Sequence, residues 1–155
     1  MSSSPRPTKP LTPKEELDPL LVEFSNLKAY ADVLRQQIEF TTGALAELTL
    51  SKASLYEIKN REGKAETLIH IGAGNYIKAF LQDVKTVVVG VGSGISIEKS
   101  IDTAISDIED RIKKAQMQIS SLQNQYLQVA ARLDQLQVRI DQLYSQIEVS
   151  NRTPK

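Results

Sequence analysis

Cysteine is absent from this 155-residue chain, and histidine occurs once, as His70. The chain therefore has no disulfide, no thiolate nucleophile and no multi-histidine metal site of its own. Tryptophan is also absent and aromatic residues make up only 5%, a composition that suits long helices better than a thick globular core. Lys+Arg 19 balance Asp+Glu 19, so no net charge favours nucleic acid or an anionic membrane as partner.

Long hydrophobic runs are missing too: no stretch approaches the length of a membrane span, and no charged-then-apolar leader precedes the body. We therefore expect a cytoplasmic protein. The length fits one ordinary domain, which we place at residues 17–155. Residues 1–16 are rich in proline and serine and bury too little apolar surface to fold, which predicts a disordered tail.

The first helix has two possible starts. Thr12-Pro13-Lys14-Glu15 fits a capping box, whereas Asp18-Pro19 offers a cap followed by proline. Because Pro19 would break or kink a helix begun at Thr12, we prefer a start near residue 19, within a helical segment 17–60. Its apolar stripe is interrupted at Thr41 and Lys52 and consists of Leu20, Phe24, Leu27, Ala31, Leu34, Ile38, Leu45, Leu48 and Leu55.

The second helix, residues 100–149, has a stricter stripe that steps by four and three without a polar interruption. A repeat of 3.5 residues sustained this long predicts a left-handed coiled coil, and an antiparallel pair within the chain is the simplest arrangement. The stripe consists of Ile101, Ile105, Ile108, Ile112, Ala115, Ile119, Leu122, Tyr126, Val129, Leu133, Leu136, Ile140, Leu143 and Ile147.

Residues 64–99 lack the helical period and contain four short segments rich in Val, Ile, Tyr and Thr. They are separated in turn by Gly72-Ala-Gly-Asn75, Gln82-Asp83-Val84-Lys85 and Gly92-Ser-Gly94. We interpret them as two β-hairpins. The glycines do not form a phosphate loop. A Walker loop ending at Lys99-Ser100 would need glycine where Glu98 stands, and the dinucleotide fingerprint fails at Ile95. The glycines instead supply positive φ in tight turns.

Strand alternation leaves apolar side chains with little to pack against inside one subunit, which predicts that the strands pair with those of other subunits. The predicted assembly residues are Ile69, Ile71, Ile77, Leu81, Val87, Val89, Val91, Ile95 and Ile97. The fold class is therefore α+β, mainly α: a long antiparallel two-helix coiled coil whose two hairpins join an oligomeric β-barrel.

No catalytic site can be argued from the remaining candidates. His70 lies alone in a strand, and Asp107, Glu109 and Asp110 have no His, Cys or second acidic motif arranged beside them. We therefore expect a protein that is not an enzyme and needs no cofactor and no metal. Three hypotheses stay open: a chaperone subunit, a structural coiled-coil scaffold or tether without client binding, and a nucleotide-dependent enzyme, which the broken glycine motifs disfavour.

The segments "IGAGNYIKA" (71–79) and "VVVGVGSGISIEKSIDTAI" (87–105) resemble the corresponding sequences of alpha subunits in the archaeal-type prefoldin (GimC) family. The resemblance covers about residues 20–147. It implies a hexamer of two alpha and four beta subunits that captures unfolded polypeptides without ATP and passes them to a group II chaperonin.

The resemblance also implies that clients bind where the helix ends expose apolar side chains. Exposed apolar patches of this kind mark binding surfaces. The candidate client-binding residues are Leu17, Leu20, Leu21, Phe24, Leu143, Tyr144, Ile147 and Val149.

Overall fold

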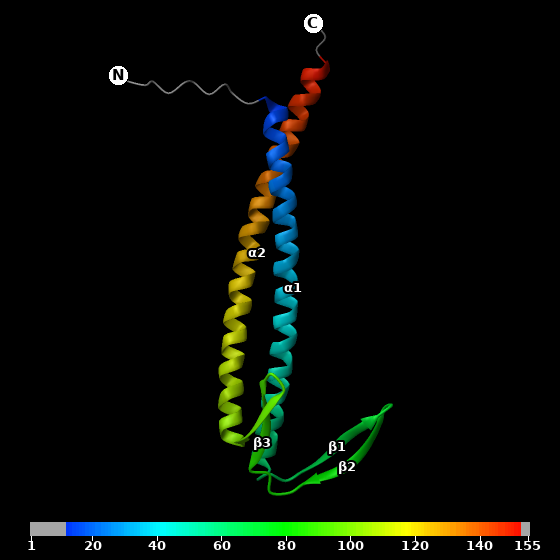
Figure 1. The fold of residues 1–155 in the computed structure, drawn as a ribbon, viewed down its shortest axis with the longest axis vertical. Helices are drawn as coiled ribbons and strands as arrows, with labels where there is room; N and C mark the ends of the chain where they lie inside the picture. Colours follow the sequence, from blue (N-terminus) through cyan, green and yellow to red (C-terminus); the bar gives the residue numbers. More distant parts are fainter. Residues whose placement is uncertain (1–11, 153–155) are drawn as a thin grey trace, which may run out of the picture. The chain divides into compact units, whose positions relative to one another are not determined.

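The computed structural model describes residues 12–152, and the element order is helix, two hairpins, helix (Figure 1). The described chain divides into two compact units. Unit 1 contains the described residues up to Ile38 and from Ser121, and unit 2 contains Glu39–Ser120. The single domain expected at residues 17–155 stays a prediction. A coiled coil can divide in this way because it makes contacts only between facing stretches of its helices.

Helix α1 spans Pro13–Asn60, so the preference for a start near residue 19 is wrong. Thr12 is the N-cap: its backbone N–H donates to Glu15 Oε2 at 2.8 Å, and Glu15 N–H donates to Thr12 Oγ1 at 3.3 Å. Pro19 lies inside the helix and removes one backbone hydrogen bond. Burial of Leu17 against α2 offsets that loss. The predicted disordered tail 1–16 is therefore wrong at residues 13–16, which belong to α1, and its residues 1–11 lie outside the described residues.

Helix α1 ends in a left-handed turn, as the Asn60–Gly63 stretch predicts. Gly63 has φ +75°, and its N–H donates to Ile58 O at 2.9 Å. A Cβ on Gly63 would lie 2.5 Å from Val84 N, and Val84 N–H itself donates to Gly63 O at 3.1 Å. Only glycine fits here, because both the backbone angle and the close approach of the following segment exclude a side chain.

The two predicted hairpins are present. Strands β1 (Ala65–Gly72) and β2 (Asn75–Leu81) pair antiparallel, as do β3 (Thr86–Gly92) and β4 (Ile95–Ser100). Each turn is a two-residue turn with positive φ at both central residues, Ala73-Gly74 and Ser93-Gly94, the geometry that matches strand twist. The glycine-rich stretches therefore turn hairpins, as predicted.

Both hairpins deviate from simple alternation at the same place. The register shifts between His70 and Gly72 and between Gly90 and Gly92, which leaves Ile71 and Val91 without a directly paired residue. Such bulges increase strand twist and redirect the extra side chain. The sequence predicts regular alternation through both positions and misses this feature.

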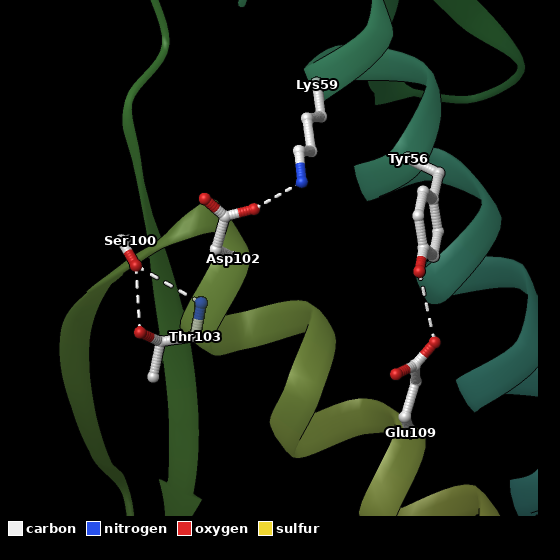
Figure 2. Close-up of polar contacts among 6 residues, drawn as sticks. All are labelled: Tyr56, Lys59, Ser100, Asp102, Thr103 and Glu109. Atoms are coloured by element: carbon white, nitrogen blue, oxygen red, sulfur yellow. Dashed lines mark hydrogen bonds and ion pairs between the residues drawn. The ribbon is translucent and has the colours of Figure 1, made fainter.

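Helix α2 spans Ile101–Arg152, three residues beyond the predicted end. Ser100 caps it, because Thr103 N–H donates to Ser100 Oγ at 3.2 Å (Figure 2). Tyr126 of its stripe is 36% exposed, and the buried stripe residues are Ile101, Ile105 and Ile108 in unit 2 and Leu122, Val129, Leu136, Ile140 and Leu143 in unit 1. Within residues 12–152, neither helix is apolar enough over a sufficient length to cross a membrane.

Candidate functional site

The helix ends of unit 1 are held together by an apolar cluster, here called the helix-end cluster. Its buried members are Leu17 from α1 and Leu136, Ile140 and Leu143 from α2, with Leu20, Phe24, Leu27 and Ile147 packed around them. A second cluster follows, in which Ala31 and Leu34 pack against Leu122 and Val129. These contacts fix an antiparallel pairing, since residues early in α1 meet residues late in α2.

One side of this pair is closed by polar contacts between the helices. Arg139 Nε and Nη2 donate to Glu16 Oε1 at 2.9 and 2.6 Å. Arg132 Nε donates to Glu23 Oε1 at 2.8 Å, and Tyr30 Oη donates to Gln125 Oε1 at 3.1 Å. In each helix these residues recur every seventh position. Each directly precedes a seam residue, that is, an apolar residue that faces the other helix. We call this side the polar flank, consisting of Glu16, Glu23, Tyr30, Gln125, Arg132 and Arg139.

The opposite side differs in chemistry. Leu21 directly follows seam residue Leu20, and Tyr144 directly follows seam residue Leu143, so in an antiparallel pair both lie away from the polar flank. Leu21 is 37% exposed and Tyr144 48% exposed. Among the described residues, no hydrogen bond or ion pair joins the two helices on this side. Gln137, which directly follows seam residue Leu136, lies on the same side. We call this side the open flank, defined by Leu21, Gln137 and Tyr144.

The helices of unit 1 also end at different heights. Arg139 lies opposite Glu16, close to the start of α1 at Pro13, whereas α2 continues to Arg152. At 1.5 Å per residue, α2 therefore runs about 15 Å beyond the start of α1. Figure 1 shows this overhang. Its apolar residue Val149 is 66% exposed and lines a shallow hollow with Ser145, Gln146 and Ser150.

The eight predicted client-binding residues divide by exposure. Leu17 and Leu143 are buried, at 7% and 0%, because they are seam residues that face the other helix; their expected exposure is wrong for this chain. Leu20, Phe24 and Ile147 are half-buried around the same cluster, and Leu21, Tyr144 and Val149 are exposed. Val22, 61% exposed, is a further exposed apolar residue that the sequence interpretation missed. The client-binding role of the predicted residues stays a prediction.

In unit 2 the helices are joined by a charged network (Figure 2). Tyr56 Oη donates to Glu109 Oε1 at 3.1 Å, and Lys52 Nζ lies 2.8 Å from the same oxygen. Lys59 Nζ lies 2.6 Å from Asp102 Oδ1. The hydrogen bond from Lys52, followed by that from Tyr56, lowers the pKa of Glu109. The polar interruption of the stripe at Lys52 is thereby explained: it reaches a carboxylate across the seam.

The two hairpins expose apolar side chains on unit 2. Of the predicted assembly residues, Ile69, Ile71, Ile77, Val91, Ile95 and Ile97 are exposed, while Leu81, Val87 and Val89 are half-buried. Leu68, Tyr76, Phe80 and Val88 are exposed as well, and the sequence interpretation missed them. The pairs Ile69–Ile77 and Leu68–Lys78 are consecutive cross-strand pairs, so they project to opposite faces and β1–β2 exposes apolar groups on both.

The isolated titratable candidates have ordinary structural roles. His70 lies opposite Tyr76, with ring centroids 5.0 Å apart. Asp107 pairs with Lys99, and Glu109 belongs to the network above. Within residues 12–152, no three His, Cys, Asp or Glu side chains are grouped as metal ligands.

Comparison with known proteins agrees with this arrangement. Residues 27–146 match the prefoldin family model, described as a prefoldin subunit. The chain is 36% identical over 120 residues to prefoldin subunit alpha of Pyrococcus horikoshii, covering 77% of this chain and 81% of that protein. It is 40% identical over 101 residues to that of Thermococcus onnurineus, covering 64% of this chain and 69% of that protein.

A solved structure shares the fold. The cryo-EM structure of filamentous PFD from Methanocaldococcus jannaschii matches with a TM-score of 0.62 at 26% identity, covering 74% of this chain and 95% of that chain. The antiparallel helices and intervening hairpins are therefore shared with a known assembly-forming protein.

Proposed function

We propose that this chain, which belongs to the prefoldin family, is a subunit of an ATP-independent holdase that binds unfolded polypeptides at its helix ends and delivers them to a group II chaperonin. The observation that carries the proposal is the exposure of Leu21, Val22, Tyr144 and Val149 around a closed helix-end cluster. Such a surface offers apolar contacts without opening the seam that holds the helices together.

The proposed client surface differs from the residues first expected. Leu17 and Leu143 hold the helices in place, and the exposed residues make the contact. An unfolded chain presents apolar side chains without fixed spacing, so a surface of aliphatic and aromatic groups suits it better than a shaped pocket. Because burial of apolar surface drives the binding, no nucleotide is required.

The proposed assembly is a hexamer of two alpha and four beta subunits in the cytoplasm, joined through the hairpins. Isolated two-stranded hairpins are marginal in water. Both faces of β1–β2 expose apolar side chains, which partner strands would cover. The names of the relatives, prefoldin subunit alpha, support the alpha role.

Client binding is tested by light scattering of a chemically unfolded protein diluted into the assembled complex without ATP. The triple substitution Leu21→Ser, Tyr144→Ser and Val149→Ser should weaken suppression of aggregation. The control triple Leu50→Ser, Met117→Ser and Leu127→Ser removes apolar groups elsewhere that are on average more exposed and should not weaken it. Equal loss in both would indicate a non-specific effect, and no suppression by the unaltered complex would favour the scaffold alternative.

Assembly is tested separately by sedimentation after co-expression with beta subunits. Replacing the cross-strand pair Ile69 and Ile77 by lysine places two charges in the proposed interface and should prevent the hexamer. Leu50→Lys, on an exposed position of α1, is the control and should leave it intact. A hexamer that still forms in the double variant, Ile69→Lys with Ile77→Lys, would contradict the hairpin interface.

A further inference from the structure

We propose that the open flank selects unfolded segments in which apolar residues stand beside lysine or arginine. The inference rests on the proposed client-binding function and specifies the client that this site prefers. Its basis is a difference in charge between the two sides of the helix pair in unit 1.

On α2, the exposed Tyr144 stands between two exposed carboxylates. Asp141 is three residues before it and Glu148 four residues after it, the two spacings at which helical side chains become neighbours. Asp141 accepts a hydrogen bond from Gln137 Nε2 at 2.9 Å. Neither carboxylate has an ion-pair partner among residues 12–152, so both negative charges are available to a bound segment.

On α1, Asp18 occupies the corresponding place. It lies three residues before Leu21 and four before Val22, and it too is exposed without an ion-pair partner in the described chain. The cations nearest Leu21 in sequence are Lys14 and Lys28, each seven residues from it and likewise exposed. Asp18, Asp141 and Glu148 outnumber these two cations. The apolar groups of the open flank are therefore bordered by more carboxylates than cations.

The polar flank shows the contrast. There the two carboxylates, Glu16 and Glu23, are each bonded to an arginine of α2. The carboxylates of the polar flank are thus paired, whereas Asp18, Asp141 and Glu148 beside Leu21 and Tyr144 have no ion-pair partner in the described chain. A client cation placed beside those side chains gains Coulomb attraction, whereas a client carboxylate there is repelled.

The same charges argue against a second copy of this chain as the occupant. Two copies docked through their open flanks would bring Asp18, Asp141 and Glu148 of one close to the same carboxylates of the other. An unfolded segment avoids this repulsion because it can supply lysine or arginine and has no fixed arrangement of its own.

The test uses three fluorescent peptides with one identical Leu/Phe core and flanks of lysine, serine or glutamate. Each is titrated against the assembled complex and followed by anisotropy at low and high salt. With two carboxylates each contributing what exposed charge pairs usually do, the lysine peptide should bind about fivefold tighter than the serine peptide. The glutamate peptide should bind more weakly than both. The differences should shrink at about 0.5 M salt, where screening is strong.

Variants of this chain assign the effect. Asp141→Asn with Glu148→Gln should remove the preference, and Asp141→Lys with Glu148→Lys should reverse it. The matched control, Glu39→Lys with Glu47→Lys, changes the net charge equally at exposed positions of α1 in unit 2 and should leave the preference unchanged.

The outcomes separate the two proposals. A preference for lysine flanks that reverses only in the Asp141/Glu148 variant supports the inference. Equal binding of all three peptides overturns the charge preference and leaves the holdase proposal standing, as does a reversal that the control variant reproduces. Failure of every peptide to bind, together with no suppression of aggregation, overturns both.

Discussion

Leu143 is the side chain on which closure of the helix ends depends most. It is 0% exposed, within a cluster that joins α2 to Leu17 of α1. Replacing a fully buried leucine by alanine generally costs 2–5 kcal/mol, depending on how far the surroundings collapse into the cavity. Two helices can shift toward each other more easily than a globular core can, so we expect the lower part of that range, about 2–3 kcal/mol.

Hydrogen exchange of the backbone amides in unit 1 is the suitable assay, because it reports local opening. A loss of about 2–3 kcal/mol corresponds to roughly 30- to 150-fold faster exchange, at tenfold per 1.4 kcal/mol. The acceleration should be confined to residues near the cluster and absent from β1–β2 in unit 2. The neighbouring substitution Tyr144→Ala removes a larger but half-exposed side chain and should change opening by about 0.5 kcal/mol or less. If both variants exchange alike, Leu143 does not hold the helix ends and our assignment of the seam is wrong.

Three further predictions follow from individual contacts. Thr12→Ala removes the cap of α1 and should destabilise its first turn by about 1 kcal/mol, seen as faster exchange of the amides of residues 14–16. Gly63→Ala forces a Cβ to within 2.5 Å of Val84 N at a positive φ. It should lower the free energy of unfolding, measured by urea denaturation, by more than the roughly 1 kcal/mol that left-handed strain alone costs; an unchanged free energy of unfolding would contradict the contact. Lys52→Met should raise the pKa of Glu109 toward its ordinary value of 4.5, because the Lys52 hydrogen bond is the main cause of its lowering. Since the pKa of Glu109 is depressed in the folded state, its contribution to stability is present above that value and is lost as the pH falls through the lowered pKa, which carboxyl NMR titration and acid unfolding of both variants would measure.

The periodic parts of the fold could be predicted from sequence because their pattern is local. The stripe of α2 repeats regularly without interruption. The hairpins are marked by glycine-containing turns, which occur where predicted. The start of α1 could not be predicted in this way. Pro19 lowers the local helix preference, and the compensating contacts of Leu17 and Glu16 come from residues more than a hundred positions away.

The candidate site was predicted in outline and not in detail. A stripe identifies which residues face the partner helix, but the exposure of each depends on the pairing of the two helices. Leu143 and Tyr144 are adjacent in sequence, yet one is fully buried and the other half-exposed. The polar and open flanks likewise could not be predicted, because they depend on the antiparallel register that places Glu16 against Arg139.

The unequal ends of α1 and α2 have a kinetic consequence. Beyond the point where α1 begins, each further turn of α2 gains its own backbone hydrogen bonds but no packing from α1, so the free energy needed to melt it falls toward the C-terminus. Exposed Val149 lies in such a turn, whereas Ile147 still packs against the helix-end cluster, so we expect opening to begin on the C-terminal side of Ile147. On the client-binding function proposed above, a segment that first touches a partly melted turn would be bound before it is aligned, as the helix re-forms. Association through such an end depends less on the orientation of the collision than docking onto a rigid surface does.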